Sequence, residues 1–278
     1  MQRYGKEQRQ SRSITFPQAF SVGTITYLVA DKLNESPAQG TCSFLWPVMT
    51  GFKPNYLTKA YPQLFNSFHP DFLHSLNIDL TNKRIPELVP AIARLTGLRK
   101  LEFSDTYLSA DDLRRLEALV NLQELQVRNC EVAGRDMAKS ALLKNIVWLT
   151  FERLDDSSPV VSVLSQSKKL VGLNLSQCQL SHADIVKIAR LSNLRDLQLK
   201  STNIDDDDLI KLGTLKKLSS LNLEACNNLT PDCINTLKTF KSLRDLYLPS
   251  RFRSPRIRRA LKQALPNLKD MHSIEIFD

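Results

Sequence analysis

Apolar residues recur along this chain with a period of 24 or 25 residues. In each unit, leucine or another large apolar residue occupies positions 1, 4 and 6, Thr or Cys occupies position 9, and an aliphatic residue follows at position 11 or 12. The pattern is clearest between Leu194 and Leu229. Units begin at Leu73, Leu98, Leu122, Ile146, Leu170, Leu194, Leu218, Leu243 and Leu268. A fixed period of this kind, in the range of about 20–50 residues, indicates stacked structural repeats.

Each unit contains two hydrophobic periodicities. Positions 4 and 6, such as Leu173 and Leu175, alternate with polar residues and predict a short strand. Apolar residues then recur every three positions, as in Ile185, Ile188 and Leu191, which predicts one face of a short helix. No unit buries its apolar side alone, so stacked units are expected to share one core. Positions 3, 5 and 7 then project from the opposite side of the strands.

Helix starts are marked by capping residues. Ser109–Asp112, Ser181–Asp184 and Asp205–Asp208 each place a side-chain acceptor at the N-cap and an acid three residues later. Thr230 followed by Pro231 predicts a helix with proline at its first position, where the missing N–H costs nothing.

The units resemble the leucine-rich repeat family, whose pattern is L-x-x-L-x-L-x-x-(N/C)-x-L, from Leu73 to about Ile274. They are most similar to the ribonuclease-inhibitor-like or bacterial type, with Cys or Thr at position 9 and an outer helix. The resemblance implies an α/β solenoid shaped like a horseshoe, with parallel strands on the concave face and short helices on the convex face.

Three segments are predicted. Residues 1–12 are polar and basic and are expected to form a disordered arm, and residues 73–278 comprise about eight repeats and a C-terminal cap. Residues 13–72 hold six of the chain's 13 prolines and many aromatics. We expect this segment to be an N-terminal cap, with a strand over 22–29, a short helix near 62–68 and irregular loops elsewhere. A separate docking module is the alternative.

The unit that begins at Ile146 departs from the pattern. Leu154 occupies position 9, and Asp155–Pro159 replaces the usual turn into the helix, which predicts a bulge or, alternatively, a site. Trp148 occupies position 3 of this unit. It is either an exposed anchor for a partner or a side chain that packs along its neighbours.

The residues at positions 3, 5 and 7 define a candidate binding surface on the concave face. It is mixed in charge and rich in amides, which suits a protein or peptide partner better than the one-signed basic groove expected for nucleic acid. The candidate contact residues are Lys100, Glu102, Gln126, Arg128, Trp148, Thr150, Asp196, Gln198, Lys200 and Tyr247.

A second candidate surface is the basic segment from Arg251 to Lys262, where Pro255 is expected to start a helix. A solvated face of the C-terminal cap is the favoured interpretation, and docking on nucleic acid or an anionic membrane is the alternative. The basic residues are Arg251, Arg253, Arg256, Arg258, Arg259 and Lys262.

Cysteine usage favours a reducing compartment. Cys130, Cys178 and Cys226 occupy position 9, where other units have Thr, so they are expected to be small buried residues and not disulfide partners or metal ligands. Five apparently free thiols, without a convincing signal peptide or membrane-spanning segment, predict a cytoplasmic protein.

No motif for catalysis, a cofactor or a metal is recognised. Glycine-rich phosphate loops are absent from the sequence, the four histidines are scattered, and Asp205–Asp208 is better explained as a helix start than as a calcium loop. We therefore expect a monomeric, non-enzymatic protein-interaction module. The alternatives are an anion-recruited protein and a substrate-receptor or adaptor subunit of a larger complex.

Overall fold

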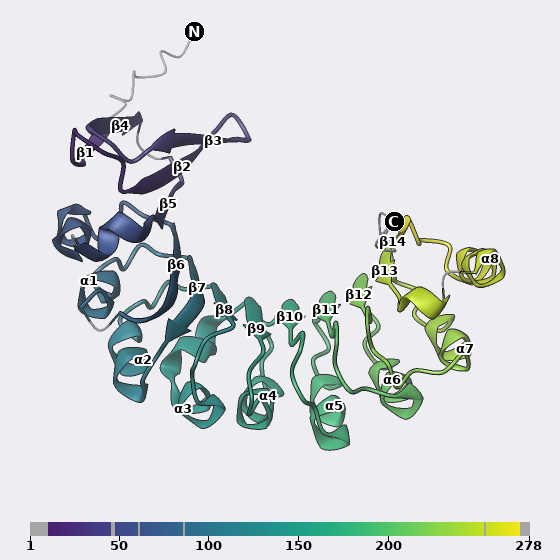
Figure 1. The fold of residues 1–278 in the computed structure, drawn as a ribbon. Coiled ribbons are helices and arrows are strands. Elements are labelled where there is room, and N and C mark those ends of the chain that lie inside the picture. Colours follow the sequence, from purple (N-terminus) through teal and green to yellow (C-terminus); the bar gives the residue numbers. More distant parts are fainter. Residues whose placement is uncertain (1–10, 46–47, 61, 86, 253, 273–278) are drawn as a thin grey trace, which may run out of the picture.

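The computed structural model describes residues 11–45, 48–60, 62–85, 87–252 and 254–272. The chain forms an arc with strands along its inner side and helices along its outer side (Figure 1). Nine strands of the arc are parallel and follow one another in chain order. They are β6 (Ser75–Arg84), β7 (Lys100–Tyr107), β8 (Glu124–Arg128), β9 (Trp148–Glu152), β10 (Gly172–Asn174), β11 (Asp196–Gln198), β12 (Ser220–Asn222), β13 (Asp245–Tyr247) and β14 (Asp270–His272).

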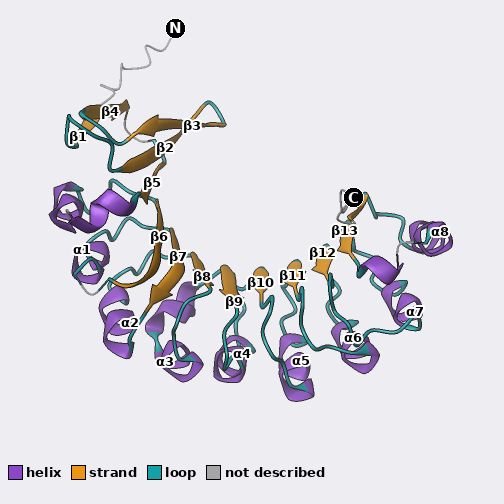
Figure 2. Ribbon diagram, in the orientation of Figure 1, coloured by secondary structure: helices purple, strands orange, loops and turns teal. Residues whose placement is uncertain are grey.

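Short helices follow the strands and cover the outer side of the sheet (Figure 2). They are α1 (Val89–Ala93), α2 (Ala110–Leu116), α3 (Gly134–Lys139), α4 (Ser158–Leu164), α5 (His182–Ile188), α6 (Asp206–Leu212), α7 (Cys233–Leu237) and α8 (Pro255–Ala264), with 3₁₀ turns η3 (Ala141–Asn145) and η4 (Ser250–Phe252). Among the described residues, no helix has the length and apolar character needed to cross a membrane.

The predicted helix starts are largely confirmed. Ser109 and Ser181 form capping boxes with the acids three residues later, and the Asp205 side chain accepts a hydrogen bond from the Asp208 N–H. The predicted start at Thr230–Pro231 is wrong, because α7 begins at Cys233. A tighter turn precedes it, in which the Cys233 N–H donates to the Thr230 carbonyl at 3.1 Å.

One hydrophobic core runs through the arc, and positions 4 and 6 supply much of it. Position 9 lies beside this core. The thiols of Cys178 and Cys226 donate to the Phe151 and Leu199 carbonyls of the preceding repeat, at 3.6 and 3.0 Å. Cys130 is buried in the same way, and burial raises the pKa of its thiol to about 11. The prediction of small buried residues without disulfides is confirmed for these three cysteines.

Position 8 turns the chain away from each strand. In six consecutive repeats this residue has a positive φ, between 50° and 62°, although none of the six is glycine. The left-handed conformation is uncommon for non-glycine residues. The six are Asp105, Asn129, Arg153, Gln177, Ser201 and Ala225.

The N-terminal segment is more ordered than its sequence predicts. It contains β1 (Ser11–Thr15), β2 (Gly23–Val29), β3 (Lys32–Pro37), β4 (Thr41–Leu45), β5 (Thr50–Pro54), and 3₁₀ turns η1 (Tyr56–Ala60) and η2 (Pro62–Ser67). The predicted strand and short helix correspond to β2 and η2, but the loops predicted elsewhere are wrong. β5 pairs parallel with β6, and β2 and β3 add antiparallel strands, so the sheet has twelve strands and ends at β3.

Aromatic packing closes the first repeat. Phe16, Phe52, Phe65 and Phe68 are buried together, with ring centroids 5.4–6.1 Å apart among the pairs formed with Phe68 and Phe52. The predicted disordered arm includes Ser11 and Arg12, and this part of the prediction is wrong because both belong to β1. Residues 1–10 of the arm lie outside the described residues.

The departing unit keeps a regular strand. β9 pairs with β8 and β10 without a register shift. The difference is confined to the turn that follows. Leu154 fills position 9 with an apolar side chain, and the buried Ser157 hydroxyl donates to the Gln179 carbonyl of the next repeat at 3.1 Å.

Candidate functional site

The predicted contact residues lie on the inner side of the sheet, on β7, β8, β9, β11 and β13 or, for Lys200, just after β11. Residues that are directly paired across strands share a face, and position 3 stays aligned from Lys100 through Glu124 and Trp148 to Gly172. These residues therefore lie on the concave face, as the repeat pattern predicts. Their contacts, however, divide the surface into two parts.

On β7 to β9 the charged side chains bind one another. Lys100 Nζ lies 2.7 Å from Glu124 Oε1. The Arg128 guanidinium lies 2.8 Å from Glu152 and 3.3 Å from Glu102. It also donates to the amide oxygen of the buried Gln126 at 2.8 Å. This part of the concave face is a cross-strand network of paired charges.

Trp148 lies beside Gly172 of the neighbouring strand. A Cβ atom at position 172 would overlap the Trp148 ring, so glycine makes the space in which the ring lies. The ring is half-buried. Trp148 therefore packs along its neighbour and still presents part of its surface. Thr150, two residues later, is only 2% exposed and offers almost no surface to a partner.

On β10 to β13 amides bind the local backbone. The side-chain oxygens of Asn174 and Asn222 accept the N–H groups of Ser176 and Glu224, both at 2.9 Å. Each amide thus occupies the N–H group at position 7, and both strands end at the asparagine.

The charged and aromatic residues of this part are less densely paired. Gln198 donates to Asp196 at 2.8 Å, and Lys200 lies 2.8 Å from Glu224. Asp245 forms no ion pair with any side chain that the structure describes. Tyr247 is half-buried.

The concave face also carries an apolar row that the sequence analysis missed. Leu28 pairs with Leu33 across β2 and β3, and the Leu28 N–H donates to the Met49 carbonyl at 3.1 Å. The register from Thr26 through Gly51 to Ser75 places this row on the same face as position 3 of the repeats. Leu28, Leu33 and Met49 are 39%, 67% and 48% exposed. Exposed apolar side chains grouped in this way are typical of binding surfaces.

A weak sequence signal explains why the row was missed. β2 and β3 are joined by Ala30 and Asp31, which both have positive φ. Hairpin turns of this kind are usually marked by Asn-Gly or Asp-Gly, and neither pair occurs here. The alternation within 22–29 predicts a strand, but no feature of the sequence indicates which strand pairs with it.

The basic residues near the C-terminus have different roles. Arg251 donates to the carbonyls of Cys226 and Leu229, at 2.8 and 2.7 Å, and so closes the loop of the preceding repeat. Arg253 lies outside the described residues. The remaining predicted residues are exposed on α8: Arg256, Arg258, Arg259 and Lys262.

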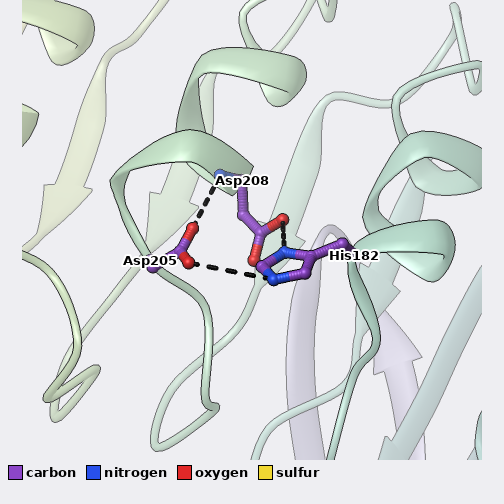
Figure 3. A group of neighbouring side chains, drawn as sticks. All are labelled: His182, Asp205 and Asp208. Atoms are coloured by element: carbon purple, nitrogen blue, oxygen red, sulfur yellow. Dashed lines mark hydrogen bonds and ion pairs between the residues drawn. The ribbon is translucent and has the colours of Figure 1, made fainter.

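The structure brings together three potential metal ligands that the sequence analysis treated separately. His182 Nδ1 lies 2.7 Å from Asp208 Oδ1, and His182 Nε2 lies 4.0 Å from Asp205 Oδ2 (Figure 3). The hydrogen bond and charge of Asp208 raise the pKa of His182. The offset of one repeat between Ser181–Asp184 and Asp205–Asp208 was the signal that these helix starts are neighbours.

Existing contacts account for this cluster without a metal. Lys211 Nζ lies 3.1 Å from Asp208 Oδ1, the same oxygen that contacts His182. Asp205 caps α6 through the Asp208 N–H. The acids are therefore occupied by a helix cap and by bonds between α5 and α6.

A cavity lies at the carboxyl ends of β7 and β8, where the chain turns towards α2 and α3. Its volume is about 1060 Å³. Part of its wall is formed by three residues at position 8: Asp105, Asn129 and Arg153. The Asn129 side chain donates a hydrogen bond to Asp105, and Arg153 donates one to Asn129. The wall also contains Glu131, Arg135, Asp136 and Asp155, so four acids and two arginines line the cavity. The cavity is polar, with more acidic than basic side chains.

Many solved structures resemble this chain, and three of them illustrate the likeness. An internalin C2 of Listeria monocytogenes is 23% identical with a TM-score of 0.51, over 73% of this chain and 81% of that chain. A second internalin of the same bacterium is 17% identical with a TM-score of 0.38, over 74% and 82% of the two chains. The plant peptide hormone receptor RGFR1, in complex with RGF2, is 19% identical with a TM-score of 0.42, over 68% of this chain and 30% of that chain.

No family model matches this chain, and no curated protein matches it in sequence. The likeness to internalin C2 concerns the fold alone. It agrees with the period of 24 or 25 residues and with the parallel strands paired in register. The chain is a leucine-rich repeat solenoid.

Proposed function

We propose that this solenoid is a protein-interaction module that binds a protein or peptide segment across its concave face. The observation that supports the proposal most directly is the exposed apolar row of Leu28, Leu33 and Met49, on the same face as Trp148. A few residues supply most of the binding free energy in protein interfaces, and tryptophan is enriched among them, while grouped exposed apolar side chains mark interaction surfaces. The paired charges of β7 to β9 lie between these two anchors, the apolar row and Trp148.

The spacing of the anchors suits an extended segment. Five strand-to-strand steps separate β2 from β9. At about 4.8 Å per step they cover roughly 24 Å, which an extended chain of about seven residues spans. Such a segment would run across the strands, with apolar side chains near both ends.

The proposed contact set follows from exposure. It keeps the half-buried predicted residues and adds the exposed Leu28 and Leu33; the residues kept are Lys100, Glu102, Arg128, Trp148, Asp196, Gln198, Lys200 and Tyr247. Thr150 and Gln126 are left out because both are buried. β2 and β5 continue the sheet of the repeats, which favours a cap that contributes to the same surface over a separate docking module.

The experiment is a selection from a random peptide display library with the full chain, followed by titration of the selected peptides. Trp148→Ala and Leu33→Ser should each weaken binding by about ten-fold or more, equivalent to about 1.4 kcal/mol. Tyr247→Ala should have a smaller effect, because its ring lies beyond the span between the two anchors. Val163→Ala, at an exposed position on the outer helix α4, is the matched control and should bind normally.

Thermal unfolding of each variant separates lost contacts from lost structure. Peptides that bind Trp148→Ala and Leu33→Ser as well as the unchanged protein, while both variants remain folded, would overturn the proposal. Loss of binding in Val163→Ala would move the site to the outer helices.

A further inference from the structure

One flank of the solenoid is uniformly basic in its C-terminal half. Five loops lead from a helix to the next strand: 165–171, 189–195, 213–219, 238–244 and 265–269. They carry ten basic residues and no acidic residue. We call these ten residues the basic flank: Lys168, Lys169, Arg190, Arg195, Lys216, Lys217, Lys238, Lys241, Arg244 and Lys269.

The parallel register places these loops on one side. Strands β10 to β14 pair in the same direction with equivalent positions opposite one another. Every loop that enters a strand therefore lies at the same flank of the arc. Nine of the ten side chains are exposed, and Lys238 is half-buried.

The cations of the basic flank are not neutralised by carboxylates. Lys169 and Lys217 donate to the side-chain oxygens of Asn145 and Asn193, both at 2.7 Å. Lys241 donates to the Ala264 carbonyl at 2.9 Å. Within the described part of the chain, none of the ten forms an ion pair. Their acceptors are neutral, so the positive charge of the flank remains.

The opposite flank is mixed in charge, because Arg153 and Arg251 lie there among the acids. Asp155, Asp156, Asp205, Asp206 and Asp232 lie in the turns that lead from strands into helices or at the starts of those helices. Helix dipoles favour acids at these N-termini and bases at the C-termini, but the effect is confined to the terminal turn.

The dipole therefore does not explain the whole flank. Arg195, Arg244 and Lys269 occupy position 2 of their repeats and directly precede a strand. They extend the positive charge from the outer helices to the inner edge of the sheet.

We propose that the basic flank binds a surface of anionic lipid headgroups. Its cations spread over two dimensions, along the arc and from the helices to the strands, so a flat anionic surface meets more of them than a rod-shaped duplex does. Single-stranded nucleic acid binding normally adds aromatic side chains for base stacking. The one aromatic residue of these five loops, Phe240, is buried.

The contact would be electrostatic and reversible. Each lysine or arginine near an anionic leaflet contributes an electrostatic attraction of similar size, and this attraction falls off within a Debye length of the surface. The five loops place no exposed aromatic side chain on this flank for insertion into the bilayer. Salt should therefore release the protein.

The test is co-sedimentation of the full chain with vesicles that contain phosphatidylserine, compared with vesicles of phosphatidylcholine alone. One variant combines Lys168→Gln, Lys169→Gln, Lys216→Gln and Lys217→Gln. The matched variant removes the same charge from α8, through Arg256→Gln, Arg258→Gln, Arg259→Gln and Lys262→Gln. Glutamine retains a side-chain donor, so the bonds to Asn145 and Asn193 can persist.

We expect salt-sensitive binding to phosphatidylserine vesicles, an affinity about ten-fold or more lower in the flank variant, and a smaller loss in the α8 variant. No vesicle binding at low salt, or an equal loss in both variants, would overturn the proposal. So would tighter binding of a labelled DNA duplex or single-stranded RNA than of the vesicles, measured in the same buffer. These outcomes are independent of the peptide selection, which tests the concave face.

Discussion

Two regions of the solenoid show two kinds of polar contact between neighbouring repeats. In β7 to β9 the polar ties lie on the concave face, where Arg128 contacts both Glu102 and Glu152. From α4 to α7 a second kind of tie lies at the helix starts, in addition to the concave Lys200–Glu224 pair. Ser158 donates to Asp184 at 2.6 Å, His182 Nδ1 lies 2.7 Å from Asp208, and the Thr230 N–H donates to Asp206 at 3.0 Å.

This difference shows that a polar residue at a repeated position often serves its neighbour before it serves a partner. At position 7 of β8, Arg128 completes a network of charges across three strands. On β10 to β13, a charge at position 7 lies beside amides that bind the local backbone, so its role is different. The position in the repeat defines which way a side chain faces. Its contacts with adjacent repeats decide whether it is available.

The largest effect is expected at the helix-start ties. Asp208→Ala removes a buried carboxylate that contacts His182 and Lys211. Because hydrogen bonds to charged groups are the stronger ones, the free energy of unfolding should fall by about 2 kcal/mol, measured by urea denaturation. Asp207→Ala, at the exposed neighbouring position, should change it by less than about 0.5 kcal/mol. Equal effects of the two variants would contradict this account of the ties.

A smaller effect is expected on the concave face. Arg128→Ala breaks the network of β7 to β9, but exposed ion pairs contribute little individually. The free energy of unfolding should fall by about 1 kcal/mol, and Arg135→Ala on α3, where the side chain is exposed, should be nearly neutral. If Arg128→Ala destabilised the protein more than Asp208→Ala, the ranking of the two kinds of contact would be wrong.

The smallest effect is a pH dependence confined to the C-terminal half. Asp208 raises the pKa of His182 above its ordinary value of 6.5. A raised histidine pKa stabilises the folded state below pH 6.5, and this contribution is lost as the pH rises through the raised value. Asp205 acts in the same direction and Lys211 opposes it.

His182→Gln should therefore destabilise the protein more below pH 6.5 than well above it. Urea denaturation of both proteins at several pH values measures the difference. If the difference in unfolding free energy between the two proteins were the same at every pH, protonation of His182 would not strengthen its contact with Asp208. The lowered pKa of Asp208 acts in the acid range and is lost as the pH falls through that value, so it does not mimic this trend.

Features that lie within a single repeat could be predicted from the sequence. Contacts between two neighbouring repeats were missed. The period located the strands, the inward leucines and the caps at Ser109 and Ser181. Thr150 is buried, although the pattern of its own unit places it on the concave face. The His182–Asp208 bond joins adjacent helix starts, and it becomes predictable only when units are aligned side by side.

The N-terminal segment shows a second limit. Its strands have no repeat to identify them, and the turn at Ala30 and Asp31 lacks the usual glycine. The parallel pairing of β5 with β6 is a contact between non-repeated and repeated sequence. Local patterns predicted β2 and η2, but the row of Leu28, Leu33 and Met49 depends on pairing that no local pattern specifies.

The buried cysteines at position 9 provide a set of internal reporters. Cys130, Cys178 and Cys226 lie two repeats apart, and burial raises the pKa of each thiol. A thiol with a raised pKa reacts slowly with alkylating reagents until it reaches solvent as a thiolate. The alkylation rate of each cysteine would therefore time the opening of its own section of the solenoid, and three rates would show from which end the stack of repeats comes apart.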